Sequence, residues 1–292
     1  MRTTILLLAL FVPACSIKKI TIDTTATLMK DGGRAMEKES DLDVARAAAP
    51  GQIKSVEGIL ESAPAHRGLL EISSRACLEY AFGFLEDDVE SLTAAKDAAA
   101  RQAQSARATQ MYDRAFGYAM RLLGTYDADI RGALERGGTS WDTAVGKLPA
   151  DSVPGLTFGG MAMASAIGLN RSDPARLADL PKAKVLLERS RALDPRFNHG
   201  GASMSLGIIH AQLGDRDASR RYFREAIDTA GEGYLLPRVA MAKFLLTEPK
   251  DRKERHSILE AVLSAPRDAF PENRLANEVA RRRAARYLEA HD

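Results

Sequence analysis

The sequence predicts an all-α protein in which antiparallel helix pairs stack side by side. Three observations support this prediction. From Asp41 onward, apolar residues recur at steps of three and four, which is the spacing of one helix face. Helix stops such as Leu193-Asp194-Pro195 are followed within a few residues by new helical segments. Apart from residues 16–40, no segment combines strand-like alternation with the turn residues of a hairpin.

The first residues have the pattern of a bacterial export signal. Arg2 precedes the apolar run 3–12, which is shorter than the ~20 residues needed to span a bilayer. Val12 and Ala14 precede Cys15 as in a lipobox, so residues 1–14 are predicted to be a lipoprotein signal peptide and Cys15 the lipid-anchored residue. Two acyl chains would hold the protein firmly on a membrane. The alternative is a plain signal peptide whose cysteine is accidental.

Residues 15–40 are predicted to be a lipid-proximal tether. Residues 16–40 mix β-branched and charged residues without a helical period, so a loop is expected there. Ser16, rather than aspartate, follows the cysteine and favours the outer membrane over the inner one. Cys77, at an apolar helical position, is expected to be a buried thiol without a disulfide partner.

Residues 41–292 are predicted to form one helical domain. A short, broken helical region is expected over residues 126–153, where Gly137-Gly138 and several prolines interrupt the pattern. The other predicted helices, in order, are 41–48, 51–62, 66–86, 89–123, 156–168, 181–193, 202–213, 216–230, 234–247, 253–264 and 271–289.

Two consecutive units around Pro195 have the spacing of tetratricopeptide repeats, whose period is about 34 residues. In the first unit, small and bulky residues precede the proline at the positions where the helices cross. The second unit begins at Leu206-Gly207, turns at Gly214, and has small and bulky residues at the corresponding positions. The crossing residues are Ala183, Leu187 and Ser190 in the first unit and Ser219, Phe223 and Ala226 in the second. The fold class is therefore a tetratricopeptide-like α-solenoid, in which each pair packs only against its neighbours.

The last predicted helix is expected to cap this array. Its apolar residues share one face: Ala276, Val279, Ala280, Ala284, Tyr287 and Leu288. Arg281, Arg282 and Arg286 lie away from that face and are predicted to be solvated.

Composition and motifs argue against catalysis. The chain has 292 residues, of which 45% are hydrophobic, so a substantial core can form. Its net charge of only +2 argues against binding to a nucleic acid, which usually requires a strongly basic surface. None of the five histidines stands four residues from another, and HExxH, CxxC, phosphate-loop and nucleophile-elbow motifs are absent from the sequence. The pair Asp87-Asp88 is interpreted as a helix cap. We therefore expect a protein that is not an enzyme and has no metal or cofactor.

A ligand-binding wall is a tentative prediction for the middle of the chain. Trp141, the single tryptophan, precedes an apolar segment rich in glycine and alanine. Phe158, Met161 and Met163 in that segment could line an apolar cleft, because methionine adapts to irregular shapes. The alternative is that these side chains are ordinary core.

Three stretches together resemble the T-component (TatT) family of TRAP transporters. They are LPKAKVLLERSRALDPRFNHGGASMSLGIIHA, ASRRYFREAIDTAGE and PENRLANEVARRRAARYLEAHD. The resemblance implies a periplasmic lipoprotein, anchored to the outer or inner membrane, that forms trimers with a channel through each subunit. It also implies association with the transporter's solute-binding protein and the holding or passing of a small apolar ligand.

The sequence leaves two other functions open. A general scaffold for envelope assembly would bind a peptide or protein in the concave face of the helical array, in an open groove lined by Asn, Arg and Lys. An enzyme such as a peptidoglycan hydrolase would need convergent carboxylates, for which the sequence has no evident arrangement.

Overall fold

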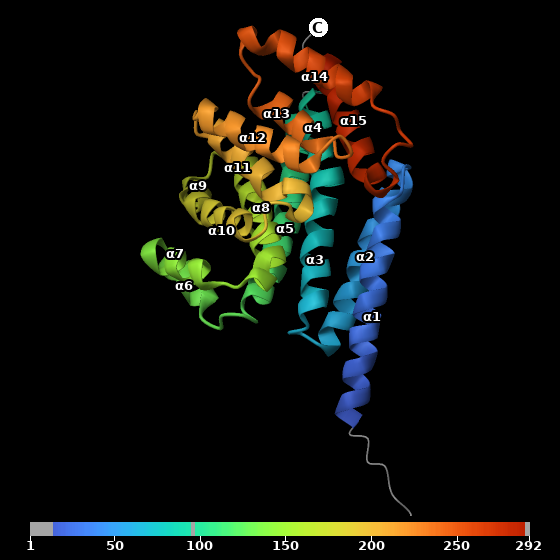
Figure 1. Cartoon of the computed structure of the whole chain (residues 1–292), viewed down its shortest axis with the longest axis vertical. Helices are drawn as coiled ribbons and strands as arrows, with labels where there is room; N and C mark the ends of the chain where they lie inside the picture. Colours follow the sequence, from blue (N-terminus) through green and yellow to red (C-terminus); the bar gives the residue numbers. More distant parts are fainter. Residues whose placement is uncertain (1–13, 95–96, 290–292) are drawn as a thin grey trace, which may run out of the picture.

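The computed structural model describes residues 14–94 and 97–289, and helices make up nearly all of this part of the chain (Figure 1). No strand occurs in these two described stretches. The α-helices are α1 Ala14–Glu37, α2 Leu42–Ser62, α3 Arg67–Tyr80, α4 Glu86–Ala94, α5 Ala98–Leu123, α6 Ile130–Arg136, α7 Gly138–Lys147, α8 Val153–Leu169, α9 Pro174–Ala178, α10 Leu180–Leu193, α11 Gly201–Gln212, α12 Arg216–Ala230, α13 Leu236–Phe244, α14 Arg252–Ser264 and α15 Arg274–Glu289. A π-helical segment, η1 Ala81–Leu85, joins α3 to α4, and 3₁₀ turns include η3 Phe197–Gly200 and η5 Pro271–Asn273. The all-α prediction is confirmed.

The expected loop over residues 16–40 is wrong, because most of this segment forms helix α1. Its threonines fit a helix by donating their hydroxyls to the carbonyl four residues earlier, as Thr21 does to Ile17 at 2.9 Å. Ala26 is buried with Leu60 and Leu70, so packing against α2 and α3 outweighs the weak local propensity. The predicted signal peptide lies almost wholly outside the described residues. Cys15 lies in the first turn of α1, and its use as an anchor stays a prediction.

Two predicted helix boundaries near the N-terminus are also wrong. The predicted helices 41–48 and 51–62 are one helix, α2, which continues through Pro50 and buries Ala45 and Ile53 on either side of it. The break expected near residue 87 lies instead before α5, where the carboxylate of Asp97 accepts a hydrogen bond from the backbone N–H of Ala100 at 2.9 Å. The chain instead stays helical through residues 87 and 88, which lie in α4 directly after the π segment.

The crossing positions predicted for residues 181–230 are buried. Ala183, Leu187 and Ser190 of α10 and Ser219, Phe223 and Ala226 of α12 have no exposed surface. Helices α8, α10, α11 and α12 pack in sequence, each against the next. The hydroxyl of Ser219 donates to the carbonyl of Gly207 at 2.8 Å and so links α12 to α11.

Helix α8 is the most apolar helix described. With the preceding turn, residues Ala150–Leu169 are long and apolar enough to cross a membrane, yet most of this stretch is buried inside the protein. It packs against α5 on one side and α10 on the other. Helix α8 is apolar on all sides because it is a central helix of the core, packed between α5 and α10.

Glycine allows the close contact of α8 with α10. A Cβ on Gly160 would lie 2.7 Å from Cγ of Leu187, which is closer than van der Waals contact allows. We expect Gly160→Ala to lower the free energy of unfolding by about 1–3 kcal/mol through overpacking, measured by urea denaturation. Gly58→Ala in α2 is the control, because a Cβ there meets nothing within 4 Å and should stabilise the helix. Equal effects at the two positions would contradict this packing argument.

The last helix is not the solvated cap that the sequence predicts. Val279, Ala280, Ala284 and Tyr287 are buried, as expected for its apolar face. Arg281, however, is 5% exposed, and the side chains of Arg282 and Arg286 are only 30% and 17% exposed. Helix α15 contacts α13, α14, α1 and α2. The C-terminal helix thus returns to the N-terminal part of the chain (Figure 1). Cys77, predicted to be a buried thiol, is fully buried, and burial raises its pKa to about 12.

Candidate functional site

A cavity of about 140 Å³ lies between helices from the first third of the chain, from its middle and from the C-terminal helix α15. Helices α3, α8, α11 and α15 surround it, with the π segment η1, the turn η3 and the C-terminal end of α1 at its edges. Its walls are mainly apolar and aromatic, as is usual for sites that bind small molecules. The apolar lining residues are Leu78, Phe82, Phe84, Phe158, Met161, Met204, Ile208, Leu236, Leu275, Ala276 and Val279.

The π segment supplies two of the aromatic walls. Phe82, Gly83 and Phe84 all line the cavity. Gly83 faces Val279 of α15, and a Cβ there would make an ordinary van der Waals contact with it at 3.7 Å. π-Helical turns of this kind occur often at functional sites.

One edge of the cavity is an ion-pair triad of Glu37, Arg75 and Glu79. Nε of Arg75 donates to the carboxylate of Glu79 at 2.7 Å, and its Nη2 donates to the carboxylate of Glu37 at the end of α1. The charges of Glu79 and Glu37 raise the pKa of Arg75. This triad joins α1 to α3. Arg75, Glu79, Phe84 and Leu275 also line a second, smaller cavity under α1, so they separate the two cavities.

An unusual turn also lines the cavity. Asn198 and His199 have left-handed backbone angles, with φ of 50° and 53°, and Gly200 follows with φ of 75°. Such conformations cost about 1–3 kcal/mol for a residue other than glycine and cluster at functional sites. The imidazole of His199 stacks on Tyr234, with ring centroids 4.3 Å apart. Burial lowers the pKa of His199 and raises that of Tyr234.

The structure places the predicted ligand-binding residues in three different environments. Phe158 and Met161 line the cavity. Trp141 lies in a separate core with Met120 and Leu148, and its indole N–H donates to the carbonyl of Lys182 at 3.1 Å. Met163 is not among the lining residues and packs against the core that contains Ile167 and Leu187. The side chain of Cys15 lies outside the described residues.

Several lining residues were not found from the sequence. Arg75, Phe82 and Phe84 come from helices whose pattern indicates only core or surface. The stretch Arg196–Gly201 did carry a signal, because it makes the loop after Pro195 two residues longer than the repeat spacing requires. The unusual turn at Asn198 and His199 lies in this loop.

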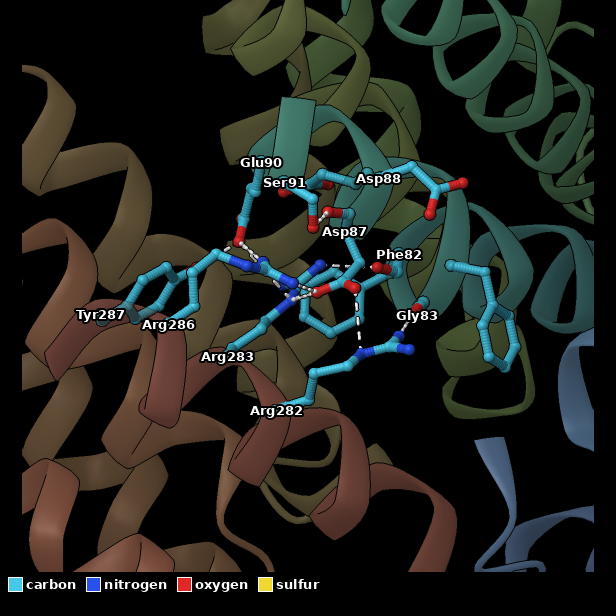
Figure 2. A network of polar contacts seen from close by, with 12 residues as sticks. Phe82, Gly83, Asp87, Asp88, Glu90, Ser91, Arg282, Arg283, Arg286 and Tyr287 are labelled. Atoms are coloured by element: carbon cyan, nitrogen blue, oxygen red, sulfur yellow. Dashed lines mark hydrogen bonds and ion pairs between the residues drawn. The ribbon is translucent and has the colours of Figure 1, made fainter. Parts of the chain in front are cut away.

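A network of buried charges fixes the wall formed by η1 and α15 (Figure 2). Asp87 pairs with Arg282 at 3.0 Å and with Arg286 at 2.9 Å, and Glu90 pairs with Arg286 at 2.9 Å. The hydroxyl of Tyr287 donates to Glu90 at 2.6 Å. The sequence predicts Asp87 to be only a helix cap. In the structure Asp87 is 3% exposed, and its carboxylate is part of this network.

Two arginines of α15, Arg282 and Arg283, donate hydrogen bonds to backbone carbonyls of the π segment. Arg283 donates to the carbonyl of Phe82 at 2.6 Å, and its guanidinium carbon lies 4.0 Å from the centre of the Phe82 ring. Arg282 donates to the carbonyl of Gly83 at 2.9 Å. A π turn leaves carbonyls without their usual helical donors, and α15 supplies donors here. The C-terminal helix therefore positions the aromatic wall of the cavity.

The charge of Glu90 makes stability depend on pH. Burial alone would raise the pKa of Glu90, but Arg283 and Lys243 hold it at about 2, below its ordinary value of 4.5. A carboxylate whose pKa is lower in the folded state stabilises the fold above its unfolded pKa. We expect this contribution to fade as the pH falls from about 4.5 to about 2.

Urea denaturation at a series of pH values tests this dependence. The free energy of unfolding of the wild type should fall more steeply below pH ~4.5 than that of Glu90→Gln, which cannot titrate at this position. Parallel profiles for the two proteins would show that Glu90 is not held charged by the network.

No group of three His, Cys, Asp or Glu side chains within residues 14–94 and 97–289 is placed to hold a metal ion. Residues 38–292 match the family described as TRAP transporter T-component. A protein of Treponema pallidum (strain Nichols), described only as an uncharacterized protein, is 24% identical over 267 residues, which cover 89% of this chain and 82% of that protein.

Proposed function

The chain belongs to the TRAP transporter T-component family, and we propose that it is a non-enzymatic accessory lipoprotein of such a transporter. In this proposal it docks the solute-binding component and holds a small apolar molecule in the cavity between α3, α8, α11 and α15. The observation that carries the proposal is the apolar cavity, whose lining residues lie within the matched segment 38–292 except for Glu37.

The arrangement of α1 supports a membrane-anchored form. The N-terminal turns of α1 project beyond the rest of the protein (Figure 1). Ile17 and Ile20 on these turns are 57% and 62% exposed. A lipid on Cys15 would therefore attach to a helix rather than to a flexible tether. We propose that this helix holds the cavity at a fixed distance from the membrane, on the periplasmic side.

The buried small and large residues of α10 and α12 support a tetratricopeptide-like arrangement of helix pairs. A trimer, implied by the family resemblance, is part of the proposal and can be tested by light scattering of the purified protein. An envelope-assembly scaffold would instead need an open groove with Asn, Arg and Lys side chains. The apolar and aromatic lining of the cavity fits a small ligand better than a peptide backbone.

Affinity purification of the tagged, full-length protein from its own envelope tests the docking role. The expected result is recovery of a TRAP solute-binding protein with the membrane fraction. Recovery would be lost for the variant Cys15→Ser if anchoring places the two proteins together. Recovery of outer-membrane assembly proteins without any transporter subunit would support the scaffold instead.

A further inference from the structure

The charges at the edge of the cavity do not balance. Three carboxylates, those of Glu37, Glu79 and Glu272, line it, whereas Arg75 is the one cationic side chain among its lining residues. Arg75 already donates to two of these carboxylates. Lys38 pairs with Glu272 at 3.1 Å from outside the lining, and still leaves one negative charge in excess.

The other polar groups at the cavity add no positive charge. His199 is stacked on Tyr234, and burial lowers its pKa, so its imidazole is neutral near pH 7. Asn198, Asn273 and Ser205 supply only neutral amide and hydroxyl groups. Arg75 already neutralises part of the charge of Glu37 and Glu79, so a carboxylate that entered would lie beside two glutamates and meet their excess negative charge.

We propose that the cavity selects small apolar molecules with a basic or uncharged hydrogen-bonding head and excludes carboxylates. This inference rests on the proposed ligand-holding role and names the class of ligand. An ammonium or hydroxyl head can donate to Glu37 or Glu79 without breaking the triad, while the apolar part of the molecule packs on Phe82, Phe158 and Leu275.

The size of the cavity limits the apolar part. A cavity of about 150 Å³ lined by aliphatic and aromatic side chains accepts benzene. The volume here, about 140 Å³, is close to that value. A single aromatic ring with a short polar arm is therefore a suitable probe.

The test compares three probes that differ only in the head group: 2-phenylethylamine, 2-phenylethanol and phenylacetate. Their dissociation constants can be measured by NMR titration of the isotope-labelled protein at low ionic strength, following the signals of Ile208 and Leu275. We expect the amine to bind about tenfold more tightly than phenylacetate, with the alcohol between them, because of the excess negative charge. This difference should shrink when salt is added.

Two variants assign the selectivity to the cavity. Glu79→Gln should reduce the preference for the amine over phenylacetate to about threefold or less. Glu272→Gln should also reduce the preference for the amine. The side chain of Glu272 is 65% exposed, so this substitution should not disturb folding. The exposed Glu61→Gln in α2 lies outside the cavity and should leave the preference unchanged.

The probe titrations test the charge selectivity separately from the ligand-holding role. Equal or tighter binding of phenylacetate at the cavity would overturn the charge selectivity and leave the ligand-holding role intact. Failure of all three probes to shift cavity signals would count against both. Retention of the full preference in both glutamine variants would show that these carboxylates do not cause it.

Discussion

Replacing Asp87 with asparagine is expected to lower the free energy of unfolding by about 3–5 kcal/mol, because it leaves buried arginines without their shared carboxylate. Asp87 is 3% exposed and lies against Arg282, Arg283 and Arg286 of the last helix. Asparagine keeps the size of the side chain but removes its charge. The measurement is equilibrium denaturation in urea, with circular dichroism as the readout.

The matched control is Asp129→Asn, which breaks the Arg136 pair on the protein surface. Both side chains of this pair are more than half exposed, so the expected loss is below about 1 kcal/mol. The Asp87 variant should also change the NMR signals of Phe82, because Arg283 and Arg282 hold the π segment. A loss at Asp87 no larger than that at Asp129 would mean that α15 does not depend on this network.

Trp141→Ala is expected to destabilise the protein by about 3–5 kcal/mol without changing ligand binding at the cavity. The indole is 1% exposed, and its N–H donates to the carbonyl of Lys182, so truncation leaves a large void and removes this hydrogen bond. The measurements are urea denaturation and titration of the folded variant with the aromatic probes.

Phe158→Ala is the informative comparison for the tryptophan variant. Phe158 lines the cavity and packs on Phe197, with ring centroids 5.6 Å apart, so its truncation should change both stability and probe affinity. If the Trp141 variant lost probe binding while the Phe158 variant kept it, the sequence-based assignment of Trp141 to the ligand wall would be right and the cavity described here would not be the binding site.

Local periodicity predicted the helices of the second half well, since α8, α10, α11 and α12 lie within a few residues of the expected ranges. Periodicity failed for α1, because the threonines and isoleucines of that segment have a weak helix propensity. The helix is stabilised by the packing of Ala26 on its neighbours, which the local sequence does not show. It also failed at Pro50, where α2 continues because packed residues flank the proline on both sides.

The cavity was harder to predict because its parts are far apart in sequence. Asp87 and Arg286 are separated by about 200 positions, and neither has a local pattern that indicates its partner. Arg282 and Arg286 lie on the outer side of α15 on a helical wheel, but in the folded chain they bind η1 and α4. Phe158 and Met161 were predicted because apolar residues beside small ones indicate close packing. That same pattern could not separate them from Met163 or Trp141.

A high-resolution crystal structure of the protein purified from its own envelope, without exchange of bound molecules, tests the central claim most directly. The account predicts electron density for one small non-protein molecule between Phe82, Phe158 and Leu275, with no carboxylate bound to Arg75 other than those of Glu37 and Glu79. A cavity filled by the protein's own side chains would contradict it.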